Sequence, residues 1–256
     1  YATAGDHLIR IRGSFPNIRF NNTGDKLKVK SVENLGTVGW TKLDKAFRGC
    51  TNMTSFTAGT TDTSSVTNMT EMFRDCTSIT SLNVSSFNTS SVTMFSSMFR
   101  SCTSLTSLDV TNFDTSSASG ANGIQAMFYQ CSSLTSLDVS NFDTSSATNF
   151  SSVFRQLTLT SLDVSNFDTS SATYMGYMFT DSNNLTSLDL SNFDTSSVTS
   201  MRNMLNCSSL TSIVGAEDFD ITSFNATNGL NGFLDSNGKM TTAQYDALLV
   251  KWDAQS

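Results

Sequence analysis

The sequence predicts an α/β solenoid, a stack of about seven similar coils, and three observations carry this prediction. A phrase of about 26 residues recurs, for example in 102–128, 131–154 and 182–205. A period of 20–29 residues is typical of solenoids, in which neighbouring coils bury each other's apolar faces. Two apolar columns follow the period, the first at Phe47, Phe73, Phe99, Phe128, Phe154, Phe179 and Leu205, the second at Phe87, Phe113, Phe142, Phe167, Phe193 and Phe219. Both columns lengthen at the same coil, so 119–123 is predicted to be a looped-out insertion.

Each coil begins with a predicted short strand. Leu105, Leu108, Val110 and Phe113 give L-x-x-L-x-V-x-x-F, the frame of a leucine-rich repeat with Phe in the place of Asn. The alternation of apolar and polar residues is typical of a half-buried strand. We therefore expect one parallel sheet on the inner face of an arc.

A short helix is predicted on the outer face of each coil. Asp-Thr-Ser-Ser follows the Phe, and then come apolar residues such as Met69, Met72 and Phe73. Spacings of three and four favour a helix of about two turns with one apolar side. Asp, Thr and Ser are the residue types that cap the free N–H groups of a helix.

The two ends differ from the repeats and are predicted to be caps, because an open solenoid end exposes its core. Residues 1–39 form a predicted β capping region, in which 8–32 alternates apolar and basic residues around Asn-Asn-Thr-Gly-Asp and indicates a β-hairpin. The repeats span 40–215 in units of 25–29 residues. Residues 216–256 form a predicted C-terminal cap with an amphipathic helix over 241–253. Its signals are a capping box at Thr241–Gln244 and the stripe Tyr245, Leu248, Leu249 and Trp252.

Composition excludes several classes of function. The chain carries a net charge of −7, and 51–213 holds four Arg, no Lys and twelve Asp plus Glu. Non-specific nucleic-acid binding needs Lys and Arg, and an anionic membrane would repel such a surface. No apolar run approaches the roughly 20 residues of a membrane-spanning helix. We therefore expect neither nucleic acid as a partner nor direct membrane insertion.

No catalytic residues are predicted, and we expect a protein that is not an enzyme and needs no cofactor. The chain has one histidine, His7, so Ser-His-Asp and Cys-His sets are absent from the repeats. The repeated carboxylates share one kind of environment, which does not separate an acid from a base. No glycine loop of the kind that cradles phosphate is present.

The cysteines occupy one column and predict buried, reduced thiols. Its members are Cys50, Cys76, Cys102, Cys131, Leu157, Ser182 and Cys207. Leu in the column favours a buried core position, and without a C-x-x-C pair a zinc site is poorly supported. A disulfide between neighbouring coils stays open as an alternative.

The strand face carries the first candidate binding surface. Four carboxylates, Asp109, Asp138, Asp163 and Asp189, are flanked by Ser107, Ser136, Ser161 and Ser187. Like charges at strand spacing repel each other, so their presence indicates that a bound partner offsets the repulsion. Calcium or a basic or glycan partner could do so. A plain solvated acidic row, kept for solubility, is the other interpretation. A second Asp column, beginning at Asp114, is interpreted as turn and cap residues.

The loop edge is the alternative binding surface. The strand face has few aromatic residues, so sugar stacking would have to come from loops. Tyr129, Tyr174 and Tyr177 are the candidates.

MFRDCTSITSLNVSSFNTSSVT and MFRSCTSLTSLDVTNFDTSS resemble the BspA-like leucine-rich repeats, and more narrowly the 25–26-residue repeat of mycoplasma and lactobacillus surface proteins and some phage tail proteins. The resemblance covers about 40–215. It implies a non-enzymatic recognition or adhesion module, extracellular on a cell or virion surface, that binds a glycan or protein of a host or neighbouring cell. The alternative is a structural subunit of a cell-surface filament or phage tail fibre, with self-assembly.

Overall fold

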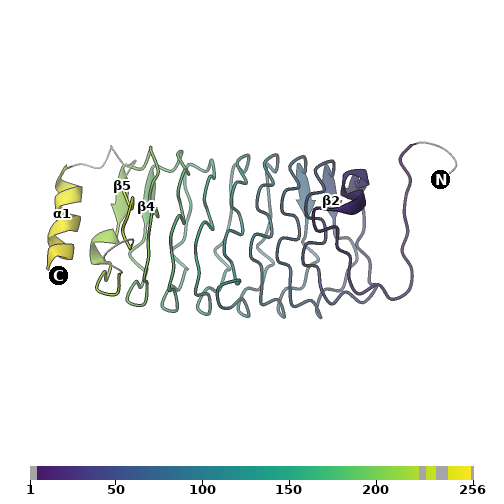
Figure 1. The fold of residues 1–256 in the computed structure, drawn as a ribbon, viewed down its shortest axis with the longest axis horizontal. Coiled ribbons are helices and arrows are strands. Elements are labelled where there is room, and N and C mark those ends of the chain that lie inside the picture. The colour runs from purple at the N-terminus through teal and green to yellow at the C-terminus, as the bar shows by residue number, and fades with distance from the viewer. Residues whose placement is uncertain (1–4, 225–228, 235–241, 255–256) are drawn as a thin grey trace.

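The computed structural model describes residues 5–224, 229–234 and 242–254. The coils are stacked along one long axis, with the two termini at opposite ends of the molecule (Figure 1). Regular elements are short, and in chain order they are η1 (Gly24–Lys28), β1 (Ser31–Val32), β2 (Ser55–Thr57), β3 (Ser81–Asn83), β4 (Ser187–Asp189), β5 (Ser212–Val214), η2 (Ala216–Asp218) and α1 (Thr242–Asp253). No described helix is both long and apolar enough to cross a bilayer.

The strands pair in parallel between successive coils, as the repeat predicts. One sheet has the order β1-β2-β3, and β4 pairs with β5. In the first sheet Ser55 faces Ser81 and Phe56 faces Leu82. Leu82 is buried between the exposed Ser81 and Asn83, which is the predicted alternation. The equivalent segments 107–109, 136–138 and 161–163 of the central coils lie outside the named strands.

The predicted outer helices are wrong for the described repeats, where the outer face consists of stacked turns. The N–H of Phe73 donates to Met98 O of the next coil at 2.9 Å, whereas a helix would bond it four residues back. The N–H of Met72 bonds Met69 O three residues back. Two residues in this coil, Glu71 and Asp75, have positive φ, 56° and 62°, which interrupts any helix. A spacing of three and four therefore fits two consecutive turns as well as a helix.

The predicted N-terminal β-hairpin is also wrong, because this segment forms a further coil. The N–H groups of Phe20 and Asn22 donate to Ala46 O and Arg48 O of the next coil, and β1 pairs with β2 in parallel. The alternation of apolar and basic residues in 8–32 fixed an extended backbone but not its partner. Before this coil the chain is extended, and Leu8, Ile9 and Ile11 are exposed.

At the other end of the stack lies α1, within the segment predicted to be helical (Figure 1). Trp252 is buried, with its ring centre 5.5 Å from that of Phe233. Leu249, predicted to share the apolar stripe, is 45% exposed. Thr241 and the side chains of Tyr245 and Leu248 lie outside the described residues.

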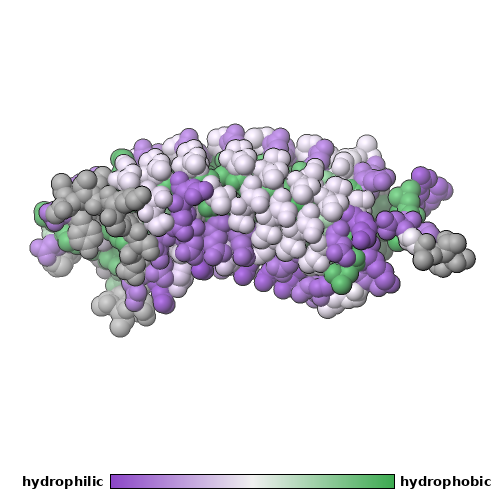
Figure 2. Space-filling model, turned by 90° about the horizontal axis from the view of Figure 1, so that it is seen from above, coloured by the Kyte–Doolittle hydropathy of each residue, from purple (hydrophilic) through white to green (hydrophobic). Residues whose placement is uncertain are grey.

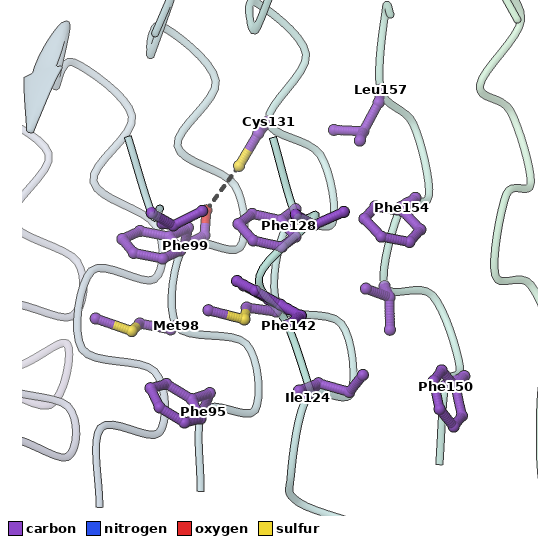
Figure 3. Packing of buried hydrophobic residues seen from close by; sticks show 14 of the residues in the cluster. Phe95, Met98, Phe99, Ile124, Phe128, Cys131, Phe142, Phe150, Phe154 and Leu157 are labelled. Carbon is purple, nitrogen blue, oxygen red and sulfur yellow. Dashed lines mark hydrogen bonds between the residues drawn. The ribbon is translucent and has the colours of Figure 1, made fainter. Parts of the chain in front are cut away.

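Both predicted Phe columns lie in the core, which runs the length of the stack. Rings of the first column stack face to face: Phe73 and Phe99 are 5.9 Å apart at 5°, and Phe99 and Phe128 are 5.9 Å apart at 8°. Figure 3 shows the next step, from Phe128 to Phe154, in the same row. The second column is buried throughout. Burial of each such ring is worth about 1.5–3 kcal/mol, so neighbouring coils depend on one another.

The five cysteines are free and buried, which confirms the predicted thiol column. Each thiol except Cys50 donates to the carbonyl of a column Phe one coil earlier, for example Cys131 Sγ to Phe99 O at 3.0 Å (Figure 3). Ser182 uses its hydroxyl in the same way, with Phe154 O at 2.6 Å.

Candidate recognition surface

On the strand face, the four predicted carboxylates are exposed and are used to form turns. Oδ1 of Asp109 accepts the N–H of Thr111 at 3.0 Å and its hydroxyl at 2.6 Å. Asp138, Asp163 and Asp189 accept the N–H two residues on at 2.9, 2.9 and 3.0 Å. This is the Asx-turn, in which the side chain replaces a backbone acceptor.

These hydrogen bonds outweigh repulsion between the stacked charges. The hydroxyl and then the N–H of Ser165 hold the pKa of Asp163 below its usual value, against smaller opposing effects of Asp138 and Asp189. The pKa of Asp109 is lowered in the same way by Thr111. The sequence assigned a turn role only to the second Asp column, where Asp114 bonds Ser116 at 3.0 Å. The structure extends that role to the first column, so the charges need no bound ligand to explain them.

The strand face therefore offers a flat row of exposed Ser107, Ser136, Ser161 and Ser187 beside carboxylates that each already use one oxygen. Among the described residues, no three His, Cys, Asp or Glu side chains gather as a metal site would require. Binding through this face, with or without calcium, stays a prediction.

The opposite candidate lies on the turn face, which we define as the surface of the stacked outer turns 45–50, 71–76, 97–102, 126–131, 152–157, 177–182 and 202–207. Here arginine and tyrosine side chains alternate along the stack. Cζ of Arg100 lies 4.6 Å from the ring centre of Tyr129, and Cζ of Arg155 lies 5.1 Å from the same ring. Arg155 and Arg202 lie 5.3 and 5.9 Å from the ring centre of Tyr177. We call these five residues the Arg–Tyr row.

A groove of about 530 Å³, open to solvent, lies beside this row. All three tyrosines of the loop-edge prediction contribute to it, Tyr129 from one coil and Tyr174 and Tyr177 from another. Its lining is Arg100, Gln125, Ala126, Tyr129, Asn149, Ser151, Ser152, Arg155, Tyr174 and Tyr177.

The repeat itself builds the row. Arg100, Tyr129 and Arg155 each follow a stacked Phe of the first column, so in these three coils a buried ring is followed by a side chain that reaches the surface. Because the rings stack in register, the following side chains stack too. Tyr177 enters from the turn residue two positions before Phe179, where φ is 63°.

Charge compensation differs along the turn face. Glu71 binds Arg48 at 2.7 Å and Arg74 at 2.6 Å, so both cations are paired. Arg155 has Asp181 at 3.5 Å. Arg100 makes no ion pair among the described residues, and burial, followed by the nearby charge of Arg74, lowers its pKa. An anion that enters the groove would stabilise the positive charge of Arg100.

The sequence predicted the three tyrosines but not their arginine partners. One signal for them was available, because Arg74, Arg100 and Arg155 all stand directly after the Phe column. Since residues 51–213 hold four Arg and no Lys, a recurring position among so few cations indicates a basic row on an acidic molecule.

Comparison with known proteins identifies one matching family model. A family model described as "Mycoplasma protein of unknown function, DUF285" matches residues 41–136 and 122–232. This match confirms the resemblance to the mycoplasma-type repeat. No curated protein matches the chain.

Two solved structures are similar over most of their length. A leucine-rich repeat protein from Bacteroides ovatus shares 13% identity, with 94% of this chain and 86% of that chain covered and a TM-score of 0.29. An internalin from Listeria monocytogenes shares 13% identity, with coverages of 85% and 87% and a TM-score of 0.17.

Proposed function

Because the chain belongs to the DUF285 family of Mycoplasma proteins of unknown function, whose description names no activity, we propose its function from its surface: a non-enzymatic recognition module that binds its ligand in the groove beside the Arg–Tyr row. The observation that carries the proposal is the meeting of Tyr129, Tyr174 and Tyr177 with Arg100 and Arg155 in one open groove. Tyrosine and arginine are the residue types enriched where binding energy concentrates.

The rest of the surface supports this choice. The face visible in Figure 2 is mostly white, which marks intermediate hydropathy, and purple, which marks hydrophilic residues, with small green apolar areas. Its short Ser, Thr and Asn side chains suit a soluble, displayed repeat. We propose that the protein acts outside the cell, on a cell or virion surface, and binds a glycan or a protein there.

A binding array of glycans and host proteins, run with and without calcium, tests the proposal. Hits are re-measured with Tyr129→Ala/Tyr177→Ala and with the matched strand-face control Asp138→Asn/Asp163→Asn. We expect the tyrosine pair to abolish binding and the aspartate pair to leave it unchanged, with circular dichroism showing both folded. The reverse pattern would place recognition on the strand face and end the groove proposal.

One observation favours the alternative, a subunit that packs end to end in a filament or tail fibre. Leu8, Ile9 and Ile11 are exposed beside the N-terminal coil, where a second copy could cover them. Analytical ultracentrifugation over a range of concentrations would reveal such packing. Assembly that Ile9→Lys abolishes would favour the structural role, whereas a monomer throughout would leave recognition as the function.

A further inference from the structure

The cations between residues 51 and 213 gather on one face. All four arginines between 51 and 213 lie on the turn face, and three of them, Arg100, Arg155 and Arg202, belong to the Arg–Tyr row. The net charge of −7 makes the remaining surface unattractive to anions. An anionic ligand is therefore drawn to this row and oriented along it.

The spacing of the cations limits the ligand. A tyrosine separates successive arginines, and with coils about 4.8 Å apart the cations recur at roughly 10 Å. Phosphates of one duplex strand recur about every 3.4 Å along the helix axis, which is a denser row of charges than the arginines match. Side chains on one face of an extended acidic peptide recur at about 6.8 Å. A linear glycan with one uronic acid in each disaccharide carries its carboxylates two sugar rings apart, a separation of the same order as the arginine spacing.

The groove also offers an apolar platform beside the charges. Arginines flank Tyr129 and Tyr177, whereas no guanidinium lies over Tyr174 in the described part of the chain. The ring of Tyr174 lies against Gly176, where an added Cβ would come within 2.7 Å of Oη and 2.8 Å of two ring carbons. The equivalent residues of neighbouring coils, Ser151 and Arg202, carry side chains, so the backbone conformation at this position does not itself require glycine. Gly176 is therefore a positioning residue that lets Tyr174 lie in the groove.

We propose that the groove binds a linear acidic glycan with one carboxylate per disaccharide. Arg100 and Arg155 bind successive carboxylates, and Tyr174, one coil beyond Arg155, packs against the neutral sugar that follows. Gln125, Asn149 and Ser152 supply amide and hydroxyl groups for the sugar hydroxyls. This inference rests on the proposed function, since it names the ligand class of the same groove.

Calorimetry with defined oligosaccharides tests the ligand class. The probes are chains of alternating glucuronic acid and N-acetylglucosamine, the same chains with the carboxylates reduced to alcohols, a polyuronate charged on every sugar, poly-glutamate and a single-stranded oligonucleotide. We expect the alternating chain to bind tightest, and its affinity to fall between about 50 and about 200 mM NaCl as screening grows. Equal binding of the reduced chain, tighter binding of any other probe, or no binding of the alternating chain would overturn the proposal.

Two variants test the assigned contacts. Arg100→Gln should weaken binding of the alternating oligosaccharide by about tenfold, the loss expected for one charge-assisted hydrogen bond. It should leave the affinity for the reduced oligosaccharide unchanged. Gly176→Ala should weaken binding of both oligosaccharides, because it displaces Tyr174 without removing a charge. Asp163→Asn, on the strand face, is the matched control and should change neither. Unchanged affinity in Arg100→Gln and Gly176→Ala would overturn the assignment.

The two levels of the proposal fail in different ways. If array ligands of another class bind and their binding is lost in Tyr129→Ala/Tyr177→Ala, the recognition function holds and the acidic-glycan proposal is wrong. If binding of no array ligand changes in the groove variants, both the proposed function and the acidic-glycan proposal are wrong.

Discussion

Each cysteine except Cys50 donates its thiol to a Phe carbonyl one coil earlier, so most positions of the column hold a small donor in the core, with Leu157 as the exception. Ser182 meets the same need with a hydroxyl. The sequence predicted that the thiols are buried, because Leu157 shares their column. It did not predict the carbonyl partner, because hydrogen bonds between coils depend on how the coils are offset.

The buried thiols should make stability depend on alkaline pH. Burial raises the pKa of Cys50, Cys131 and Cys207 to about 12. A thiol is neutral when protonated, so this contribution to stability is complete below the unfolded pKa of about 8.5 and is lost as pH rises toward 12. Between pH 8 and 11 the melting temperature should therefore fall less in Cys131→Ser than in the unchanged chain.

A thiol titration is the companion measurement. All five cysteines should react with a thiol reagent only after denaturation, since each is free and buried. Fewer than five reactive thiols in the denatured chain would reveal a disulfide. In the alkaline experiment, an equal fall of melting temperature with pH in Cys131→Ser and in the unchanged chain would contradict the assignment of the pH effect to Cys131.

The Asp column on the strand face should tolerate asparagine. Asn83 already forms the same turn, with the N–H of Ser85 at 3.2 Å and its hydroxyl at 2.8 Å. We expect Asp138→Asn/Asp163→Asn to fold normally at pH 7. Since the pKa values of both carboxylates are lowered in the fold, their contribution is present above the unfolded pKa of about 3.9 and is lost below it. On acidification to pH 3 the double variant should therefore lose less melting temperature than the unchanged chain; an equal loss would contradict the turn role.

At the scale of the element, sequence periodicity identified which residues face the core but not the backbone that carries them. Met69, Met72 and Phe73 are buried as predicted, yet they lie in turns. Asn21 and Asn22 form the expected turn, but the segment pairs with the next coil rather than with itself. Both errors have one cause: in a solenoid the partner of each N–H is a coil away, beyond any local pattern.

Glycine substitutions distinguish stacked turns from helices. Ser97 has a φ of 57°, whereas its neighbour Ser96 is absent from the positive-φ positions. Ser97→Gly should keep or raise stability by up to about 1 kcal/mol, because glycine adopts this conformation without strain. Ser96→Gly should cost about 0.5–1 kcal/mol. Urea unfolding measures both, and a helix would instead lose about 1 kcal/mol in each variant.

At the scale of the whole molecule, the repeat predicted a continuous stack, and the Phe column confirms it from Phe47 to Phe179. The groove is less predictable, because its residues come from four coils and meet only when the coils are in register. Sequence pattern supplied the tyrosines as candidates. Their meeting with Arg100 and Arg155 follows from the stacking of the rings beneath them.

Because of that stacking, a core mutation should destabilise the adjacent coils most and more distant coils progressively less, rather than all coils equally. Phe128 is fully buried between Phe99 and Phe154, with ring centres 5.9 and 6.1 Å away. Phe128→Ala should cost about 3–5 kcal/mol, as large-to-small changes at buried aromatic residues do. Because each coil contacts mainly its neighbours, hydrogen exchange should quicken most in 95–102 and 150–157 and progressively less toward both ends. Phe47→Ala, near the N-terminal end, is the matched control and should quicken exchange mainly around 20–22 and 69–75. A uniform loss of protection over all coils in both variants would show that the stack unfolds as one globular unit and would contradict nearest-neighbour coupling.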